Sequence, residues 1–240
     1  MARTRWQTVA GIGIIFSVAL VATPVAAKGK TNVTPLHFVS HPQAGFPEQD
    51  ILVGGKGIAP GRAVRVDVKD AQHAPNLGKQ VYMSYVPIPH DPFKVTAKPL
   101  GPFSRGEALG FTLGEWLAGT GSGRYIVAGD KAFLSARFQK LVPGGLYTMW
   151  CSRVKLPPKP IITDYPCGKA DGSQNTLRAN ARGNATFNLA LPPLQPSDEK
   201  TLTVVALAYH SDGQTHGADP GPFGSATHVQ LFTALPAPTH

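Results

Sequence analysis

The chain has few charged residues, and this shortage narrows the class of protein. Charged residues make up 15% of the 240 residues, well below the roughly 25% that is usual in soluble domains. The 26 glycines and 23 prolines favour short elements separated by turns, which excludes a helical bundle. The hydrophobic share of 42% is large enough to build a buried core. The composition therefore predicts a folded, turn-rich protein.

Several motifs that carry catalysis are absent. The sequence contains no Gly-x-Ser-x-Gly, no phosphate loop, no Gly-x-Gly-x-x-Gly after a strand and no His-Glu-x-x-His. Neither cysteine is followed by a histidine, which argues against a blue-copper site. These absences remove several common classes of secreted enzyme, so a non-enzymatic protein is favoured.

Residues 1–27 have the three-part layout of a secretory signal peptide. Two arginines precede an apolar run from Val9 to Ala22, and a stretch of small residues ends at Ala27, as in a cleaved leader. The run is shorter than the roughly 20 residues that span a bilayer, so we expect no stable membrane anchor after cleavage. These features predict a soluble protein that is periplasmic or secreted.

Positive charge exceeds negative charge, but the excess is spread thinly. The chain carries 23 Lys and Arg against 14 Asp and Glu, a formal charge of +9, and loss of the two leader arginines leaves +7. The basic residues stand singly and match no nucleic-acid-binding module, so we expect no nucleic-acid partner. The charge pattern leaves open a protein, a polysaccharide or a small ligand as the partner.

The chain has only two cysteines, Cys151 and Cys167, and both lie in the exported part. An oxidising compartment favours a disulfide between them, which would close a proline-rich loop and stabilise the fold by roughly 3 kcal/mol. The alternative is a metal-binding or catalytic thiol. It lacks the Cys-x-x-Cys pair or nearby histidine that such sites use.

Alternating apolar and polar residues predict an all-β protein. The clearest alternation is at 185–191, where Phe187, Leu189 and Leu191 share one face. A nearly continuous apolar run at 201–209 is typical of a strand covered on both faces. Further strands are expected near 51–54, 64–68, 80–86, 123–127, 132–138, 145–151 and 227–233. One short helix is expected at 111–118.

The turn Leu141-Val142-Pro143-Gly144-Gly145-Leu146-Tyr147 resembles the turn before strand F of immunoglobulin-like and fibronectin-type sandwiches. In those folds a tyrosine bonds back to the backbone, and Tyr147 is the candidate for this structural corner. The resemblance implies an immunoglobulin-like antiparallel β-sandwich, which we place at 103–235. Residues 28–102 are expected to add N-terminal strands, or a small incomplete β domain ending in a proline-rich join. Residues 236–240 are expected to fray.

The densest group of polar residues lies in the 209–228 loop and the strand that follows it. The candidate ligand-binding residues are His210, Asp212, His216, His228 and Gln230. If the loop folds back, the three imidazoles and Asp212 would converge as a nitrogen and oxygen set that suits zinc or copper(II). The alternative is a set of turn and strand-end residues that bond only the local backbone, because Asp212-Gly213 is an ordinary turn signal.

Other polar residues carry less information. A carbohydrate-active enzyme using Glu115 or Asp212 is a second alternative, because a glycosidase needs two carboxylates that flank a cleft. His37 and His41 lie in a proline-flanked extended segment, and we expect them to be solvated on the surface.

Four runs in the C-terminal half are similar to a group of uncharacterised exported bacterial β-sandwich proteins. The runs are Leu113-Gly114-Glu115-Trp116-Leu117, Tyr147-Thr148-Met149-Trp150, Tyr209-His210-Ser211-Asp212-Gly213 and His228-Val229-Gln230-Leu231-Phe232. The resemblance covers about residues 105–235 and implies export and a shared architecture, without an activity. The leading hypothesis is therefore a non-enzymatic binding or interaction module with no cofactor. The first alternative is a zinc or copper protein.

Overall fold

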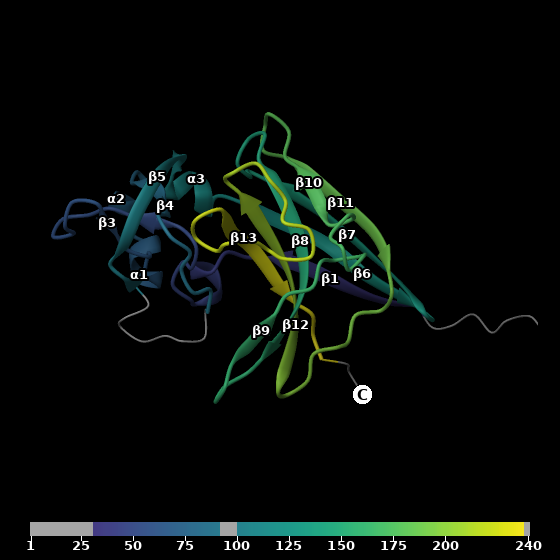
Figure 1. Cartoon of the computed structure of the whole chain (residues 1–240). Helices are drawn as coiled ribbons and strands as arrows, with labels where there is room; N and C mark the ends of the chain where they lie inside the picture. Colours follow the sequence, from purple (N-terminus) through teal and green to yellow (C-terminus); the bar gives the residue numbers. More distant parts are fainter. Residues whose placement is uncertain (1–30, 92–99, 238–240) are drawn as a thin grey trace, which may run out of the picture.

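The structure is a computed structural model that describes residues 31–91 and 100–237 (Figure 1). The expected signal peptide at 1–27, part of the proline-rich join and the last three residues lie outside the described residues. The strands form antiparallel sheets, which confirms the predicted all-β class and sandwich architecture. None of the helices in the described part of the chain has the length and apolarity needed to cross a membrane.

The sandwich consists of two facing sheets. Its strands are β1 (Asn32–Phe38), β6 (Thr120–Ala128), β7 (Lys131–Gln139), β8 (Leu146–Lys155), β9 (Ile161–Thr163), β10 (Thr176–Arg178), β11 (Ala185–Leu191), β12 (Thr201–His210) and β13 (Thr227–Ala234). One sheet has the order β1-β6-β7-β11. The other has the order β10-β8-β12-β13, with β9 also paired to β8. We call the second sheet the central sheet, because elements cover both of its faces.

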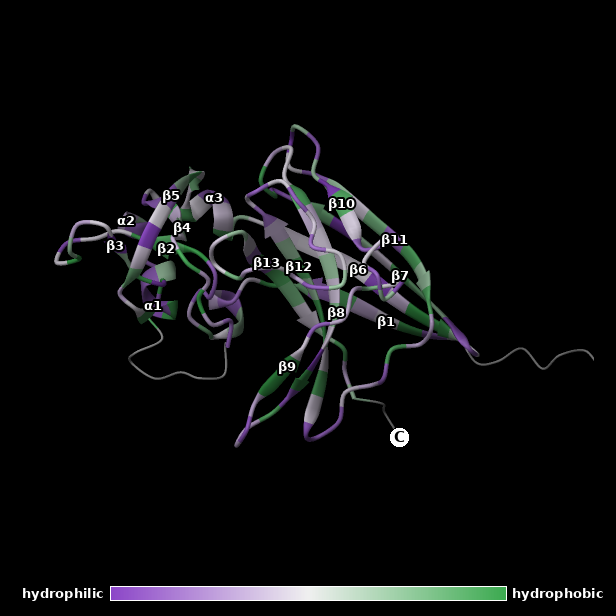
Figure 2. Cartoon of the chain, in the orientation of Figure 1, coloured by the Kyte–Doolittle hydropathy of each residue, from purple (hydrophilic) through white to green (hydrophobic). Residues whose placement is uncertain are grey.

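Alternation along the strands explains the packing between the two sheets. In β7, Leu134, Ala136 and Phe138 are buried while the residues between them point outward, and Figure 2 shows hydrophilic and hydrophobic residues alternating along β7 and β11. In β12, Val205 and Leu207 join the sandwich core, whereas the residues that alternate with them join a second apolar cluster on the opposite face. The prediction that β12 is covered on both faces is thus confirmed.

A smaller sheet lies beside the sandwich with three short α-helices. Its strands are β2 (Leu52–Val53), β3 (Arg62–Ala63), β4 (Gln80–Ser84) and β5 (Phe103–Thr112), in the order β2-β4-β5-β3. The helices are α1 (Val68–Ala71), α2 (Ala74–Leu77) and α3 (Leu113–Leu117), and a 3-10 helix spans Pro42–Ala44. This part has its own core, which includes Ile51, Val81, Phe111 and Trp116. Tyr209 of β12 packs against that core.

Each of the two parts is built from segments on both sides of residues 102/103. β1 lies in the predicted N-terminal segment but pairs with β6 of the sandwich, whereas β5 and α3 belong to the small sheet. Pro35 is exposed in β1, and a proline is tolerated there because β1 is an edge strand. The strand expected at 64–68 does not form. Only a bridge between Val64 and Val53 forms before the chain turns into α1.

The predicted helix at 111–118 is confirmed as α3, although it is shorter. It begins after Thr112 because of a capping box. The side chain of Thr112 accepts a hydrogen bond from the backbone N–H of Glu115, and the Glu115 carboxylate accepts one from the backbone N–H of Thr112 at 2.7 Å. Phe111 and Trp116 are buried and stack with ring centroids 5.6 Å apart.

Two contacts hold the sandwich together around β8. The predicted disulfide between Cys151 and Cys167 is present and buried in the sandwich core. The buried hydroxyl of Tyr147 accepts a hydrogen bond from the backbone N–H of Val142 at 2.8 Å and donates one to Gln230 Oε1 at 2.8 Å. This is the bond back to the preceding turn that a corner tyrosine makes.

We expect the variant Tyr147→Phe to lower the free energy of unfolding by roughly 1–3 kcal/mol, because it leaves the Val142 N–H and the buried Gln230 side-chain oxygen without their shared partner. Urea unfolding measures the change. Tyr165→Phe is the matched control, since Tyr165 is 53% exposed and surface changes cost within about 0.5 kcal/mol. Equal effects of the two variants would contradict a structural role for the Tyr147 hydroxyl.

Candidate metal centre

Three of the predicted ligand residues come together at the end of β12. His210 is the last residue of that strand, and Asp212 and His216 lie in the loop that follows. One possible ligand atom from each of the three residues lies within 4.8 Å of the other two. His210 is buried, His216 is partly exposed and Asp212 is exposed, so the group sits at the surface end of a buried strand.

The turn chemistry of the loop explains this convergence. Asp212 accepts a hydrogen bond from the backbone N–H of Gln214 at 3.1 Å, and Gly213 adopts a φ of 70°, which favours glycine. The ring of His216 packs directly against Gly221. A Cβ at Gly221 would lie 2.3 Å from His216 Cδ2, so any larger residue there would displace the imidazole.

The imidazole of His210 has one occupied nitrogen and one free nitrogen. Its Nε2 lies 2.7 Å from the hydroxyl oxygen of Thr148, which also accepts a hydrogen bond from the indole N–H of Trp150 at 2.7 Å. Its Nδ1 is buried and has no hydrogen-bond partner among the described residues. Burial lowers the pKa of His210 to about 4, the nearby Asp212 only partly offsetting it. The ring is therefore neutral at neutral pH.

His216 and Asp212 form the second half of the group. His216 Nε2 lies 3.3 Å from Asp212 Oδ2, and this nitrogen too is buried without a hydrogen bond to any described residue. Two atoms that bind one tetrahedral zinc ion at about 2.0–2.1 Å are about 3.3 Å apart. The spacing of this pair therefore already suits a shared ion.

His228 and Gln230 do not belong to this group, which corrects the expected convergence of three imidazoles. His228 Nδ1 bonds the backbone oxygen of Asp50 at 2.7 Å, and its Nε2 lies 2.9 Å from the Ser211 hydroxyl. The Gln230 amide is equally occupied, since its Nε2 donates to the backbone oxygen of Trp116 at 2.8 Å and its Oε1 accepts from Tyr147. Both side chains are buried and serve the packing of β13.

The geometry does not support the alternative of a carbohydrate-active enzyme that uses Glu115 or Asp212. Glu115 is occupied by its capping box with Thr112. The hydrogen bonds from Thr112 lower the pKa of Glu115, whereas a general acid needs a raised one.

A second polar group, which the sequence patterns do not predict, is buried between the small sheet and β13. The Asp50 carboxylate accepts hydrogen bonds from the backbone N–H of Val229 at 2.9 Å and from His90 Nδ1 at 2.8 Å. Burial alone would raise the pKa of Asp50, but the charge and hydrogen bond of His90 hold it below its usual value. Burial would lower the pKa of His90, but Asp50 raises it. The two form a buried ion pair.

Glu48 is the other buried carboxylate of this group. It accepts a hydrogen bond from the indole N–H of Trp116 at 3.3 Å, and its other oxygen lies 3.3 Å from His41 Nδ1. His37 is exposed as expected, but His41 is only 2% exposed, so the prediction of a solvated His41 is wrong. One feature of the sequence could have indicated this buried group. Glu48 and Asp50 stand immediately before the apolar run of β2.

Comparisons with known proteins add little to this site. No protein-family model matches the sequence, and no curated protein matches it. Among solved structures, the chain is similar to Cu/Zn superoxide dismutase from Brucella abortus at 16% identity, with a TM-score of 0.29. The alignment covers 55% of this chain and 91% of that one. A similarity at this level assigns neither a family nor an activity to the chain.

The lowered pKa of His210 predicts a specific dependence of stability on pH. A group whose pKa is lower in the folded state contributes stability that is present above its unfolded pKa, near 6.5, and is lost as the pH falls towards about 4. Urea unfolding in the presence of a chelator should therefore show a weaker pH dependence over this window for His210→Gln than for the wild type. The exposed control His37→Gln should follow the wild type. Parallel curves for His210→Gln and the wild type would contradict a neutral, buried His210.

Proposed function

We propose that the protein is an exported binding protein that holds a divalent transition metal, zinc or copper(II), through His210, Asp212 and His216. The observation that carries the proposal is a pair of buried ring nitrogens without hydrogen bonds to the described residues: His210 Nδ1, and His216 Nε2, which lies 3.3 Å from Asp212 Oδ2. Buried polar atoms without hydrogen bonds are rare in folded proteins. A metal ion would satisfy both nitrogens at once.

The chemistry of the donor set supports the choice of metal. Two imidazole nitrogens and one carboxylate oxygen suit zinc and copper(II), whereas calcium and magnesium prefer sets made only of oxygen. The His210 ring is neutral because burial lowers its pKa, so its Nδ1 lone pair is available when Nε2 carries the proton. The carboxylate of Asp212 would balance part of the metal charge.

The residues behind His210 match the outer shell of a metal site. Histidine ligands usually donate their second N–H to an oxygen atom, which fixes the orientation of the ring. Here the Thr148 hydroxyl lies 2.7 Å from His210 Nε2, and the indole N–H of Trp150 holds that hydroxyl in place. This hydroxyl can accept both hydrogen bonds, because it has two lone pairs.

Export, the absence of catalysis and the type of partner are parts of the same proposal. The disulfide between Cys151 and Cys167 favours an oxidising compartment, in agreement with the leader-like residues 1–27. Three protein ligands leave coordination positions to be filled by water or by a group from a partner. An exported module of this kind would bind the metal or present it to a protein, a polysaccharide or a small ligand.

Calorimetric titration with zinc chloride and copper sulfate, after removal of metal with a chelator, tests the proposal. We expect one ion per chain. Thr148→Val removes the hydroxyl behind His210 and should weaken metal binding about 10–100-fold. His216→Ala removes a ligand and should weaken binding by more than this.

The control for this titration is His37→Ala, because His37 is an exposed histidine on β1 that should leave the affinity unchanged. Circular dichroism confirms that each variant is folded. The absence of stoichiometric binding, or equal affinities for His216→Ala and His37→Ala, would refute the proposed metal centre.

A further inference from the structure

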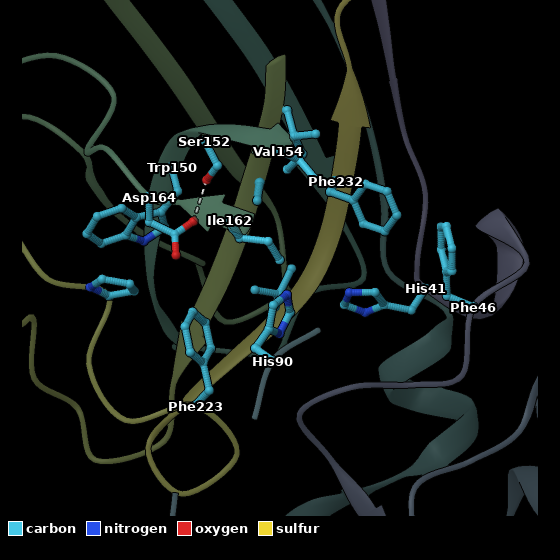
Figure 3. A pocket seen from close by; sticks show the side chains of 14 residues that line it. His41, Phe46, His90, Trp150, Ser152, Val154, Ile162, Asp164, Phe223 and Phe232 are labelled. Carbon is cyan, nitrogen blue, oxygen red and sulfur yellow. Dashed lines mark hydrogen bonds between the residues drawn. The ribbon is translucent and has the colours of Figure 1, made fainter. Parts of the chain in front are cut away.

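A second candidate site lies on the outer face of the central sheet, away from the sandwich core. A partly open cavity of about 60 Å³ is lined there by β8, β9, β12 and β13, by the segment after β9, and by loops that include His41, His90 and Phe223 (Figure 3). One water needs about 10–15 Å³ of such a volume. The cavity therefore has room for a molecule of only a few non-hydrogen atoms.

The walls of the cavity are mainly apolar, but they carry one carboxylate. Asp164 accepts a hydrogen bond from the Ser152 hydroxyl at 2.5 Å, its only hydrogen bond to a described residue. Figure 3 shows both side chains at the cavity, with the Asp164 carboxylate beside the indole of Trp150. Asp164 is partly buried, so apolar side chains replace part of the water that would normally solvate its carboxylate.

Aromatic rings supply the rest of the lining. Trp150, Phe46, Phe223 and Phe232 all line the cavity. Phe223 stacks on the ring of His90 with centroids 4.6 Å apart, which fixes the orientation of both rings. Faces of Trp and Phe rings attract cations, and the attraction is strongest where water is excluded.

The charges around the cavity favour a positive ligand over a negative one. Burial raises the pKa of Asp164, and the negative charges of Asp50 and Asp219 raise it further against the opposing effects of Ser152 and His90. His90 and Asp50 form an ion pair and act on Asp164 in opposite directions, so burial is the main cause of its raised pKa. A bound cation would relieve the unfavourable ionisation of Asp164, whereas a bound anion would increase it.

We propose that this cavity binds a small alkylammonium cation, with the Asp164 carboxylate as its counter-ion and the surrounding aromatic rings as a cage. The size of the cavity limits the ligand to a headgroup such as methylammonium or tetramethylammonium, and a longer substituent would have to extend out of the cavity. A neutral apolar molecule of the same size fits the walls but leaves the charge of the Asp164 carboxylate without a counter-ion. The site uses none of the proposed metal ligands, so the two proposals can fail independently.

The first test compares a cation with a neutral molecule of similar shape. Tetramethylammonium chloride and tert-butanol are titrated into the metal-free full chain by calorimetry, and the indole N–H signal of Trp150 is followed by NMR. We expect the cation to bind at least tenfold more tightly and to shift the Trp150 signal. Equal affinities, no measurable binding, or binding without a shift of that signal would overturn the proposal.

The second test removes the charge and keeps the shape. Asp164→Asn should lower the affinity for tetramethylammonium at least tenfold and leave that for tert-butanol unchanged. Asp130→Asn is the matched control, because Asp130 is an exposed turn residue, and it should bind the cation like the wild type. Unchanged cation binding by a folded Asp164→Asn variant would refute the role of the carboxylate. If that variant does not fold, the comparison of the two ligands on the wild type still decides.

Discussion

The buried carboxylate of Asp50 joins the two parts of the chain, and the rest of the structure depends on this contact. Asp50 lies just before β2, yet its side chain accepts the backbone N–H of Val229 in β13 and its backbone oxygen accepts a bond from His228. Its ion pair with His90 offsets the cost of burying the charge. One residue thereby fixes the segment before the small sheet, the loop that carries His90 and the last strand of the sandwich.

Hydrogen bonds through His228 connect Asp50 to the candidate metal centre. The ring of His228 is held by Asp50 on one side and lies against the Ser211 hydroxyl on the other. Ser211 is the first residue after β12 and directly precedes Asp212. The start of the ligand-bearing loop is therefore anchored to a buried network, while His216 is positioned by its packing against Gly221. The candidate site thus combines a hydrogen-bonded strand end with a loop whose turns contain glycines.

Local features of the fold could be predicted from the sequence, and long-range pairings could not. The alternation in β11, the apolar run of β12 and the capped helix α3 depend on neighbouring residues, but the period of a strand does not show which element covers it. For this reason the pairing of β1 with β6 and the burial of His41 could not be predicted from the sequence. In the candidate site, the turn joins Asp212 and His216, which are close in sequence. His228 is also near, but its Nδ1 is hydrogen-bonded to the carbonyl oxygen of Asp50, 178 positions away in the sequence. Asp164 could not be predicted, because β8, β12 and β13 assemble its surroundings.

Trp150 belongs both to the cavity and to the surroundings of the candidate metal ligands. Its ring lines the cavity, and its N–H holds the Thr148 hydroxyl that orients His210. A ligand in the cavity that tilted the indole would shift the Thr148 hydroxyl and the His210 imidazole that contacts it. If a ligand in the cavity changed the metal affinity by some factor, the metal would change the affinity for that ligand by the same factor. A single indole thus connects the cavity to the residues around the candidate metal centre.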